Sequence, residues 1–207
     1  LGQRRRQRDL GAGQQLRHRA VGLGVGGQLL ELGVVEVGHR GPDAELDGRD
    51  VPEKSAAGFV AKLNEKIAEV GVGKIASICG RYYAMDRDRR WERVKLAYDL
   101  LVHGNGKASD DMLADMQHSY DEGVTDEFLQ PLYNNHLDKN NLNIHDDDVV
   151  IFYNFRTDRP RQLTEVLTQK DFPEFDMHKL NLYYVTFANY DQNFENIHVV
   201  FEKDNLK

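Results

Sequence analysis

Arginine side chains are concentrated in two short segments that each follow an apolar run. Arg81 and Arg87 follow the first run, and Arg156 and Arg159 follow the second. A guanidinium group presents a rigid fork of N–H donors that matches two oxygens of a phosphate or carboxylate at once. Several such groups in one place would bind a small polyanion. The residue types therefore predict an anion site, provided that the fold brings the two segments together.

The two apolar runs are predicted to be strands that position these arginines. Residues 74–79 form a short apolar strand pattern, and residues 149–155 have the continuous apolar pattern of a strand buried on both faces, as in a parallel sheet. Between the start of the chain and the first of these strands, apolar residues recur at helical spacing from Val60 onward, which predicts a helix over about 54–70 that ends at Gly71.

Helices and strands alternate along the rest of the chain. We predict helices over 91–101, after an N-cap at Ser109, and around 163–167, with further strands over 182–187 and 197–201. Strands that alternate with helices imply right-handed crossovers. The predicted fold class is therefore α/β, with a mostly parallel sheet, helices on both faces, and an irregular or disordered N-terminal segment before it.

The carboxyl ends of parallel strands lie at one edge of a sheet, where open α/β folds place their ligands. The four arginines should therefore meet at that edge. The motif Asp-Gly-Arg-Asp at 47–50 precedes a predicted helix and would lie there too. Its Asp50 could accept a hydrogen bond from a substrate hydroxyl or move a proton.

A purely structural interpretation of the same residues remains open. Arg-Asp sequences often form internal ion pairs, and Asp86, Asp88 and Asp158 are available as partners. We expect the arginines at the start of the second helix to be solvated or paired and the neighbouring aromatic residues to serve in packing. These residues are Arg89, Arg90, Arg93, Tyr82, Tyr83 and Trp91.

Three other features carry less chemistry. Ser77 lies inside a strand with no base nearby in the sequence, so it is a poor nucleophile candidate. The polar stretch 123–148 is predicted to be loop, and the three aspartates at 146–148 indicate a solvated turn more than a metal site. The histidines show no metal-ligand spacing.

Composition excludes several classes of protein. The net charge of −7 argues against a general nucleic-acid binder. No run of 18 apolar residues is present, so no membrane span is expected. A single cysteine, Cys79, excludes a disulfide framework and indicates a cytoplasmic protein.

The first 41 residues differ from the rest in composition. They hold seven arginines, no lysine and ten of the 18 glycines, and they carry a net charge of +4, which leaves −11 for residues 42–207. No clean helical or strand period runs through them. We interpret residues 1–45 as an atypical segment that is disordered or translated from a wrong reading frame.

Several motifs together resemble one family. They are Asp-Gly-Arg-Asp at 47–50, Gly-Arg-Tyr-Tyr-Ala-Met-Asp-Arg-Asp-Arg-Arg-Trp-Glu-Arg at 80–93, Asp-Glu-Phe at 126–128, Phe-Arg-Thr-Asp-Arg at 155–159 and Phe-Ala-Asn-Tyr at 187–190. Over residues 46–207 the chain closely resembles cofactor-independent (2,3-bisphosphoglycerate-independent) phosphoglycerate mutases. The second motif is highly specific to that family.

The resemblance implies an isomerase that interconverts 3-phosphoglycerate and 2-phosphoglycerate in glycolysis and gluconeogenesis. In this family a phosphatase-like domain, with a nucleophilic serine and two manganese ions, carries an inserted α/β domain that orients the substrate. This chain resembles the inserted domain, over 46–200, with 201–207 as a linker toward the missing phosphatase-like domain. The positions that match family residues holding phosphoglycerate are Arg49, Asp50, Arg81, Arg87, Arg156 and Arg159.

No segment of the sequence matches the nucleophilic serine or the Asp and His metal ligands of the family. We therefore expect no catalytic nucleophile and no metal site in this chain, and no turnover by the chain alone. The alternative is a non-catalytic phosphate- or carboxylate-binding module, and a third interpretation is purely structural. The expected partners are phosphoglycerate and the missing domain, with no nucleic acid and no membrane.

Overall fold

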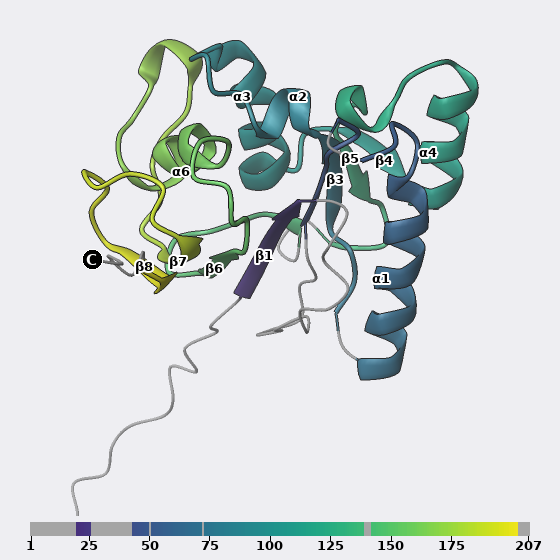
Figure 1. Ribbon diagram of the computed structural model, residues 1–207, viewed down its shortest axis with the longest axis horizontal. Coiled ribbons are helices and arrows are strands. Elements are labelled where there is room, and N and C mark those ends of the chain that lie inside the picture. The colour runs from purple at the N-terminus through teal and green to yellow at the C-terminus, as the bar shows by residue number, and fades with distance from the viewer. Residues whose placement is uncertain (1–19, 26–42, 50, 72, 139–141, 203–207) are drawn as a thin grey trace, which may run out of the picture.

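The chain folds around one sheet that is almost entirely parallel. The computed structural model describes residues 20–25, 43–49, 51–71, 73–138 and 142–202. Within these ranges the sheet has the strand order β4-β5-β3-β2-β1-β6-β7-β8, and only the β3–β5 pair is antiparallel. This confirms the predicted α/β class (Figure 1). The strands are β1 (Ala20–Val25), β2 (Asp43–Leu46), β3 (Ser77–Gly80), β4 (Lys107–Ser109), β5 (Leu132–Asn134), β6 (Val149–Phe152), β7 (Tyr183–Ala188) and β8 (Ile197–Phe201).

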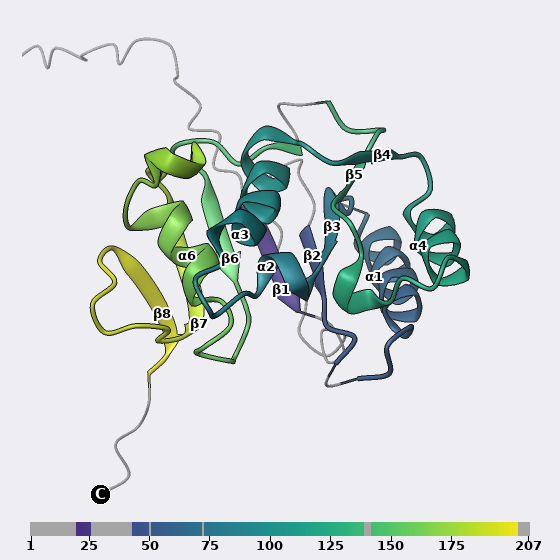
Figure 2. The same cartoon turned by 90° about the horizontal axis from the view of Figure 1, so that it is seen from above.

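Helices cover both faces of the sheet, as predicted. Successive side chains of a strand point to opposite faces. In β3, Ile78 joins the core formed with α1 and α4, whereas Cys79 joins the core formed with α2, α3 and α6. Both views show α3 near α6 and α1 beside α4 (Figures 1 and 2). The helices are α1 (Ala56–Val70), α2 (Arg81–Ala84), α3 (Trp91–Tyr98), α4 (Met112–Asp121) and α6 (Arg161–Thr168).

Short helical turns of other kinds complete the architecture. A π-helical turn, η2 (Asp99–His103), extends α3 and ends at Gly104, where φ is +64°. The 3-10 turns are η3 (Asp126–Phe128) and η4 (Pro173–Phe175). No helix in the described ranges is long and apolar enough to cross a membrane.

Helix α1 confirms its prediction, and α4 corrects one. Gly71 ends α1 in the left-handed region, with φ +82°, and its N–H donates to the Ile67 carbonyl at 2.9 Å. The prediction of Ser109 as the N-cap of α4 was wrong. Asp111 caps this helix by accepting from two backbone N–H groups, while Ser109 ends β4 and its hydroxyl donates to Asp115 at 2.6 Å. An ionised carboxylate is the stronger acceptor for the first N–H groups of a helix.

The region from 123 to 148 contains more order than predicted, because β5 and η3 lie within it. The strand prediction over 149–155 was too long, since β6 ends at Phe152. The prediction that this strand is buried on both faces was also wrong. Only alternate residues of β6 are buried, and Phe155 is 56% exposed. Helices cover one face of the sheet at β6, and the other face stays partly open to solvent.

Two strands lie in the N-terminal segment for which no element was predicted. β1 pairs in parallel with both β2 and β6, so it joins the two halves of the sheet. β2 contributes two buried acidic residues, Asp43 and Glu45. Asp43 accepts a hydrogen bond from Ser77 at 2.5 Å. The remainder of the predicted irregular segment, 1–19 and 26–42, lies outside the described residues.

Candidate functional site

The predicted arginines lie where two parallel strands end. Arg81 is the first residue of α2, directly after β3. Arg87 lies in the segment between α2 and α3. Arg156 and Arg159 follow β6 in the loop that leads into α6. β3 and β6 run in the same direction through β2 and β1, so both loops leave the same edge of the sheet. The edge predicted from the alternation of strands and helices is therefore the observed one.

Arg159 shows that the four arginines are electrostatically close. Burial and the charges of Arg81, Arg87 and Arg156 lower the pKa of Arg159, while the nearby Asp158 opposes this. Its Nη1 donates to the Met85 carbonyl at 3.1 Å, whereas its buried Nε has no hydrogen-bond partner among the described residues. A half-buried guanidinium with an unused donor beside three others favours an anion at this place.

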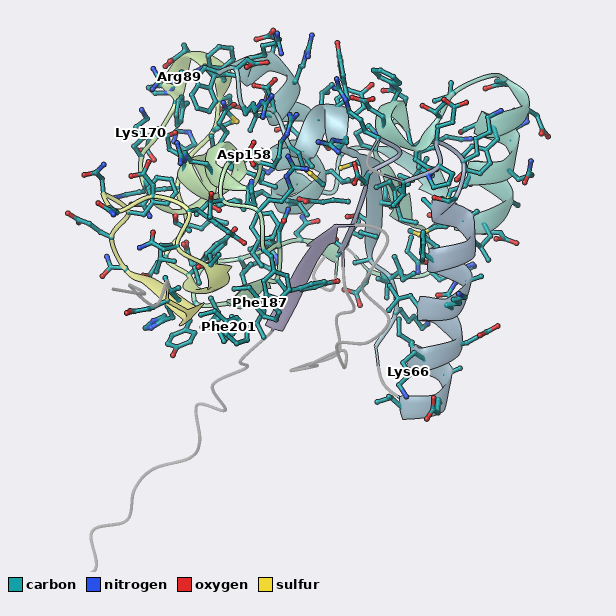
Figure 3. The ribbon with its side chains drawn as sticks, viewed as in Figure 1. Lys66, Arg89, Asp158, Lys170, Phe187 and Phe201 are labelled. Atoms are coloured by element: carbon teal, nitrogen blue, oxygen red, sulfur yellow. The ribbon has the colours of Figure 1, made fainter. Side chains whose placement is uncertain are left out.

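Arg87 and Arg156 share one carboxylate, that of Asp158. Arg87 Nη1 lies 2.8 Å from Asp158 Oδ2, and Arg156 Nε lies 3.5 Å from Oδ1. Partial burial works to raise the pKa of Asp158, but the hydrogen bond from Arg87 and the charge of Arg156 outweigh it, so the pKa is lowered. Both arginines are exposed, and Figure 3 shows Asp158 on the side of the molecule where α2 and α6 lie.

Local hydrogen bonds fix the loop that carries Arg156. The backbone N–H of Arg156 donates to the side-chain oxygen of Asn154 at 3.0 Å, which forms a tight turn after β6. The hydroxyl of Tyr190 lies 2.7 Å from the Asn154 carbonyl oxygen. Tyr190 belongs to the Phe-Ala-Asn-Tyr motif, so that motif supports the end of β6.

Arg81 differs from the other three arginines, because it is only 4% exposed and forms an ion pair with Asp47. The aspartates expected as internal partners were Asp86, Asp88 and Asp158. Asp158 does pair with Arg87 and Arg156, whereas Arg81 is paired by Asp47, which was not predicted as a partner. Asp47 belongs to the Asp-Gly-Arg-Asp motif, so the pair ties that motif to the start of α2.

Among the predicted site residues that the structure describes, Arg49 is highly exposed, with a side chain that is 62% exposed. Its Nη1 lies 3.5 Å from Glu127 Oε1. One residue, Gly48, separates it from Asp47, which contacts Arg81, so the motif adjoins the arginine loops. Asp50 lies outside the described residues.

Residues 125–129, here named the Asp126 turn, support both loops. Asp126 is fully buried, and its Oδ2 accepts from the N–H groups of Ser55 and Ala56, each at 2.9 Å. Its Oδ1 accepts from the hydroxyl of Tyr120. Burial raises the pKa of Asp126, although these hydrogen bonds oppose the shift. The Asp-Glu-Phe motif was the only sequence signal for this turn, and periodicity does not reveal it.

The arginines at the start of α3 are solvated or paired, as predicted, with Arg89 exposed and Arg90 and Arg93 paired. Arg90 contacts Asp86 at 3.2 Å and Asp88 at 2.7 Å. Arg93 lies over the Tyr82 ring, with 3.9 Å to the centroid. The predicted packing role of the aromatic residues is also confirmed, because the Trp91 ring contacts Phe172 and Tyr83 is buried.

The described residues do not fit a metal centre, because no three His, Cys, Asp or Glu side chains among them are grouped as ligands. In the 146–148 segment, Asp146 and Asp147 accept hydrogen bonds from Asn181, each at 2.7 Å. We derive no chemical step through a metal bound to this chain.

Comparison with known proteins places these features in a family. The family model described as "BPG-independent PGAM N-terminus (iPGM_N)" matches residues 42–192. A 2,3-bisphosphoglycerate-independent phosphoglycerate mutase of Flavobacterium psychrophilum is 56% identical over 164 residues, which is 79% of this chain and 32% of that protein. The corresponding protein of Bacteroides thetaiotaomicron is 54% identical over 162 residues, or 78% of this chain and 31% of that protein.

A solved structure agrees with the sequence matches. The phosphoglycerate mutase of Leishmania mexicana, crystallised at low cobalt concentration, superposes with a TM-score of 0.73 at 26% identity, over 85% of this chain and 36% of that one. The chain thus spans about a third of the length of the curated relatives it matches. It belongs to the 2,3-bisphosphoglycerate-independent phosphoglycerate mutase family, of which it matches the N-terminal family model.

Proposed function

We propose that this chain is the substrate-orienting part of a phosphoglycerate mutase and that its arginines hold phosphoglycerate. The residues assigned to this task are Arg49, Asp50, Arg81, Arg87, Arg156 and Arg159. The observation that carries the proposal is the half-buried Arg159 guanidinium, whose Nε has no hydrogen-bond partner among the described residues and which stands among the charges of three other arginines. A bound phosphate or carboxylate would supply the negative charge and the acceptor that this arrangement lacks.

The exposed arginines would exchange partners when the anion arrives. Arg87 and Arg156 share Asp158, so they are held at the site without being strongly desolvated. Their donors can turn to phosphate oxygens, while buried Arg81 keeps its place through Asp47 and supplies positive charge. Fixed positive charge and positioning provide most of the catalysis in phosphoryl transfer.

The chemical step itself belongs to a part of the enzyme outside this chain. In the proposed division of labour, a serine on a phosphatase-like domain takes the phosphoryl group and returns it to the other hydroxyl of the glycerate. The arginine set holds the glycerate between these events. Two manganese ions, if they serve the enzyme, are bound by that other domain. We assign residues 46–200 to the substrate-orienting domain and 201–207 to the linker, and we place the enzyme in cytoplasmic glycolysis.

Calorimetric titration of the full chain with 3-phosphoglycerate tests the proposal. We expect saturable binding that weakens about tenfold to a hundredfold in Arg156→Ala, since a charge-assisted hydrogen bond contributes about 1.5–3 kcal/mol. Lys66→Ala is the matched control, because it also removes one positive charge, but at the far end of α1 (Figure 3). Absence of binding by a well-folded chain, or equal losses in the two variants, would refute the proposal.

A further inference from the structure

The Asp126 turn contacts both the Asp47–Arg49 loop and the start of α2 at glycines. A Cβ at Gly48, where φ is +61°, would lie 2.7 Å from both Asp126 Cβ and Glu127 N. A Cβ at Gly80 would lie 2.3 Å from the Glu127 carbonyl oxygen. Non-bonded heavy atoms optimally lie about 3.5–4.0 Å apart, so only glycine fits at either position. The backbone preceding Arg49 and that preceding Arg81 therefore rest on one short turn.

Hydrogen bonds fix the turn itself on two sides. The Asp126 carboxylate caps α1, the helix that begins after the Asp-Gly-Arg-Asp motif. The backbone N–H of Asp126 donates to the Glu53 carbonyl at 2.8 Å. On the other side, the N–H of Gly80 donates to the Leu129 carbonyl at 2.9 Å. These bonds join the segment that follows the motif to the end of β3.

The turn also contacts the side chain of one site residue. Glu127 Oε1 lies 3.5 Å from Arg49 Nη1, and Glu127 is the residue whose backbone adjoins both glycines. The position of Arg49 relative to Arg81 is thus set through Asp126 and Glu127, in addition to the ion pair between Asp47 and Arg81. Neither acidic residue needs to touch the anion for this.

We propose that Asp126 is a positioning residue of the anion site, which it serves by fixing the Asp126 turn and, through it, Arg49 and Arg81. The inference rests on the proposed function, because it names the support for the same site. A purely structural helix cap would stabilise the fold without affecting the anion affinity of the folded protein. The two roles therefore predict different results.

Asp126→Asn, with Asp111→Asn as its matched control, distinguishes these roles. Both substitutions weaken a carboxylate that caps a helix, but Asp111 caps α4, where its Oδ1 accepts from the N–H groups of Leu113 and Ala114. Each variant is titrated with 3-phosphoglycerate at a temperature where circular dichroism shows it fully folded. We expect affinity to fall about tenfold in Asp126→Asn and to stay within twofold of the unmodified chain in Asp111→Asn.

A double-mutant cycle shows whether Asp126 acts through Arg49. The loss of affinity for 3-phosphoglycerate caused by Asp126→Asn should be smaller in an Arg49→Ala background, because the effects of substitutions at coupled residues are not additive. If Asp126→Asn does not fold, Tyr120→Phe removes one hydrogen bond to the same carboxylate and should lower affinity about twofold to threefold.

The outcomes separate the two proposals. Failure of the unmodified chain to bind 3-phosphoglycerate would overturn the proposed function and the positioning role with it. Binding by the unmodified chain that is unchanged in Asp126→Asn, or in Tyr120→Phe where that variant replaces it, would overturn the positioning role alone. If Asp126→Asn lowered affinity as much in the Arg49→Ala background as in the unmodified chain, that result would also contradict the positioning role.

Discussion

At the scale of single residues, the site combines arginines that differ in exposure and in partners. Arg81 is buried and paired with Asp47, and Arg87 and Arg156 are exposed and share Asp158. Arg159 has a buried Nε for which the described part of the chain supplies no acceptor. Such a set keeps its geometry without a ligand and still leaves positive charge only partly neutralised. Residues that serve binding in this way commonly contribute little to stability or oppose it.

Arg159→Met tests this separation of stability from binding. Removal of the charge removes both the cost of burying it and its repulsion by three other arginines. It also removes one hydrogen bond, to the Met85 carbonyl. We expect the free energy of unfolding to change by less than about 1 kcal/mol, while affinity for 3-phosphoglycerate falls about tenfold. Urea denaturation and calorimetry give the two values, and a large stability loss with unchanged affinity would contradict the assigned role.

Glu45 is a residue whose charge opposes the fold. Its side chain is buried in β2, and neither carboxylate oxygen has a hydrogen-bond partner among the described residues. Burial, with the nearby charge of Asp43, raises the pKa of Glu45 well above its ordinary value of 4.5. Because the folded-state pKa is the higher one, stability is greatest below the ordinary value and falls as pH rises through the raised value.

Glu45→Met should therefore stabilise the chain at neutral pH. We expect a gain of about 1–3 kcal/mol at pH 7, since an unpaired buried polar group is removed. The gain should narrow as pH falls below 4.5, where Glu45 becomes protonated in the unfolded chain as well. Urea denaturation across this pH range measures the difference in the free energy of unfolding between Glu45→Met and the unmodified chain. Glu69→Met is the control at a side chain that is 70% exposed, and an equal pH dependence there would contradict the explanation.

At the scale of elements, the tight contact between β3 and the Asp126 turn makes a clear prediction. Gly80→Ala should destabilise the chain by about 1–3 kcal/mol, because its Cβ would meet the backbone of Glu127. Gly58→Ala is the matched substitution inside α1, where nothing lies within 4 Å, and it should stabilise by about 0.5–1 kcal/mol. Thermal unfolding compares them, and a shift of the same sign in both would contradict the contact.

The sequence predicted those elements whose signals are local and long. α1 was predicted from its apolar spacing and Gly71, and the edge that carries Arg81 and Arg156 was predicted from the alternation of strands and helices. β4 and β5 were missed because three-residue strands show no measurable period. The ion pair of Arg81 and the support by Asp126 were missed because they join residues far apart in the sequence.

At the scale of the whole molecule, the chain carries the arginine loops but spans only about a third of its curated relatives. The match to the family model begins at residue 42, so it includes β2 and Glu45. This places residues 42–45 in the family, and the hypothesis that the segment before them derives from a wrong reading frame stays a prediction. Translation of the coding DNA in the other frames should give a family-like segment, and its absence there would refute the hypothesis.

Because the chain spans only about a third of its relatives, we expect it to bind 3-phosphoglycerate without converting it. The purified chain, supplied with 3-phosphoglycerate and manganese, should form no 2-phosphoglycerate, because the proposed serine lies outside it. The full-length relative from Flavobacterium psychrophilum is the positive control under the same conditions. Robust turnover by the chain would contradict the proposed division of labour, whereas binding alone is also what a non-catalytic module would give.

The most direct measurement is an NMR titration that observes the arginine Nε–Hε groups as 3-phosphoglycerate is added to the labelled chain. The signals are assigned with single Arg→Lys variants. We expect the signals of Arg87, Arg156 and Arg159 to shift together along one saturable curve, while that of Arg90, held by Asp86 and Asp88, stays in place. Unchanged signals from the first three, or an equal shift of Arg90, would contradict the claim that these arginines form one site for phosphoglycerate.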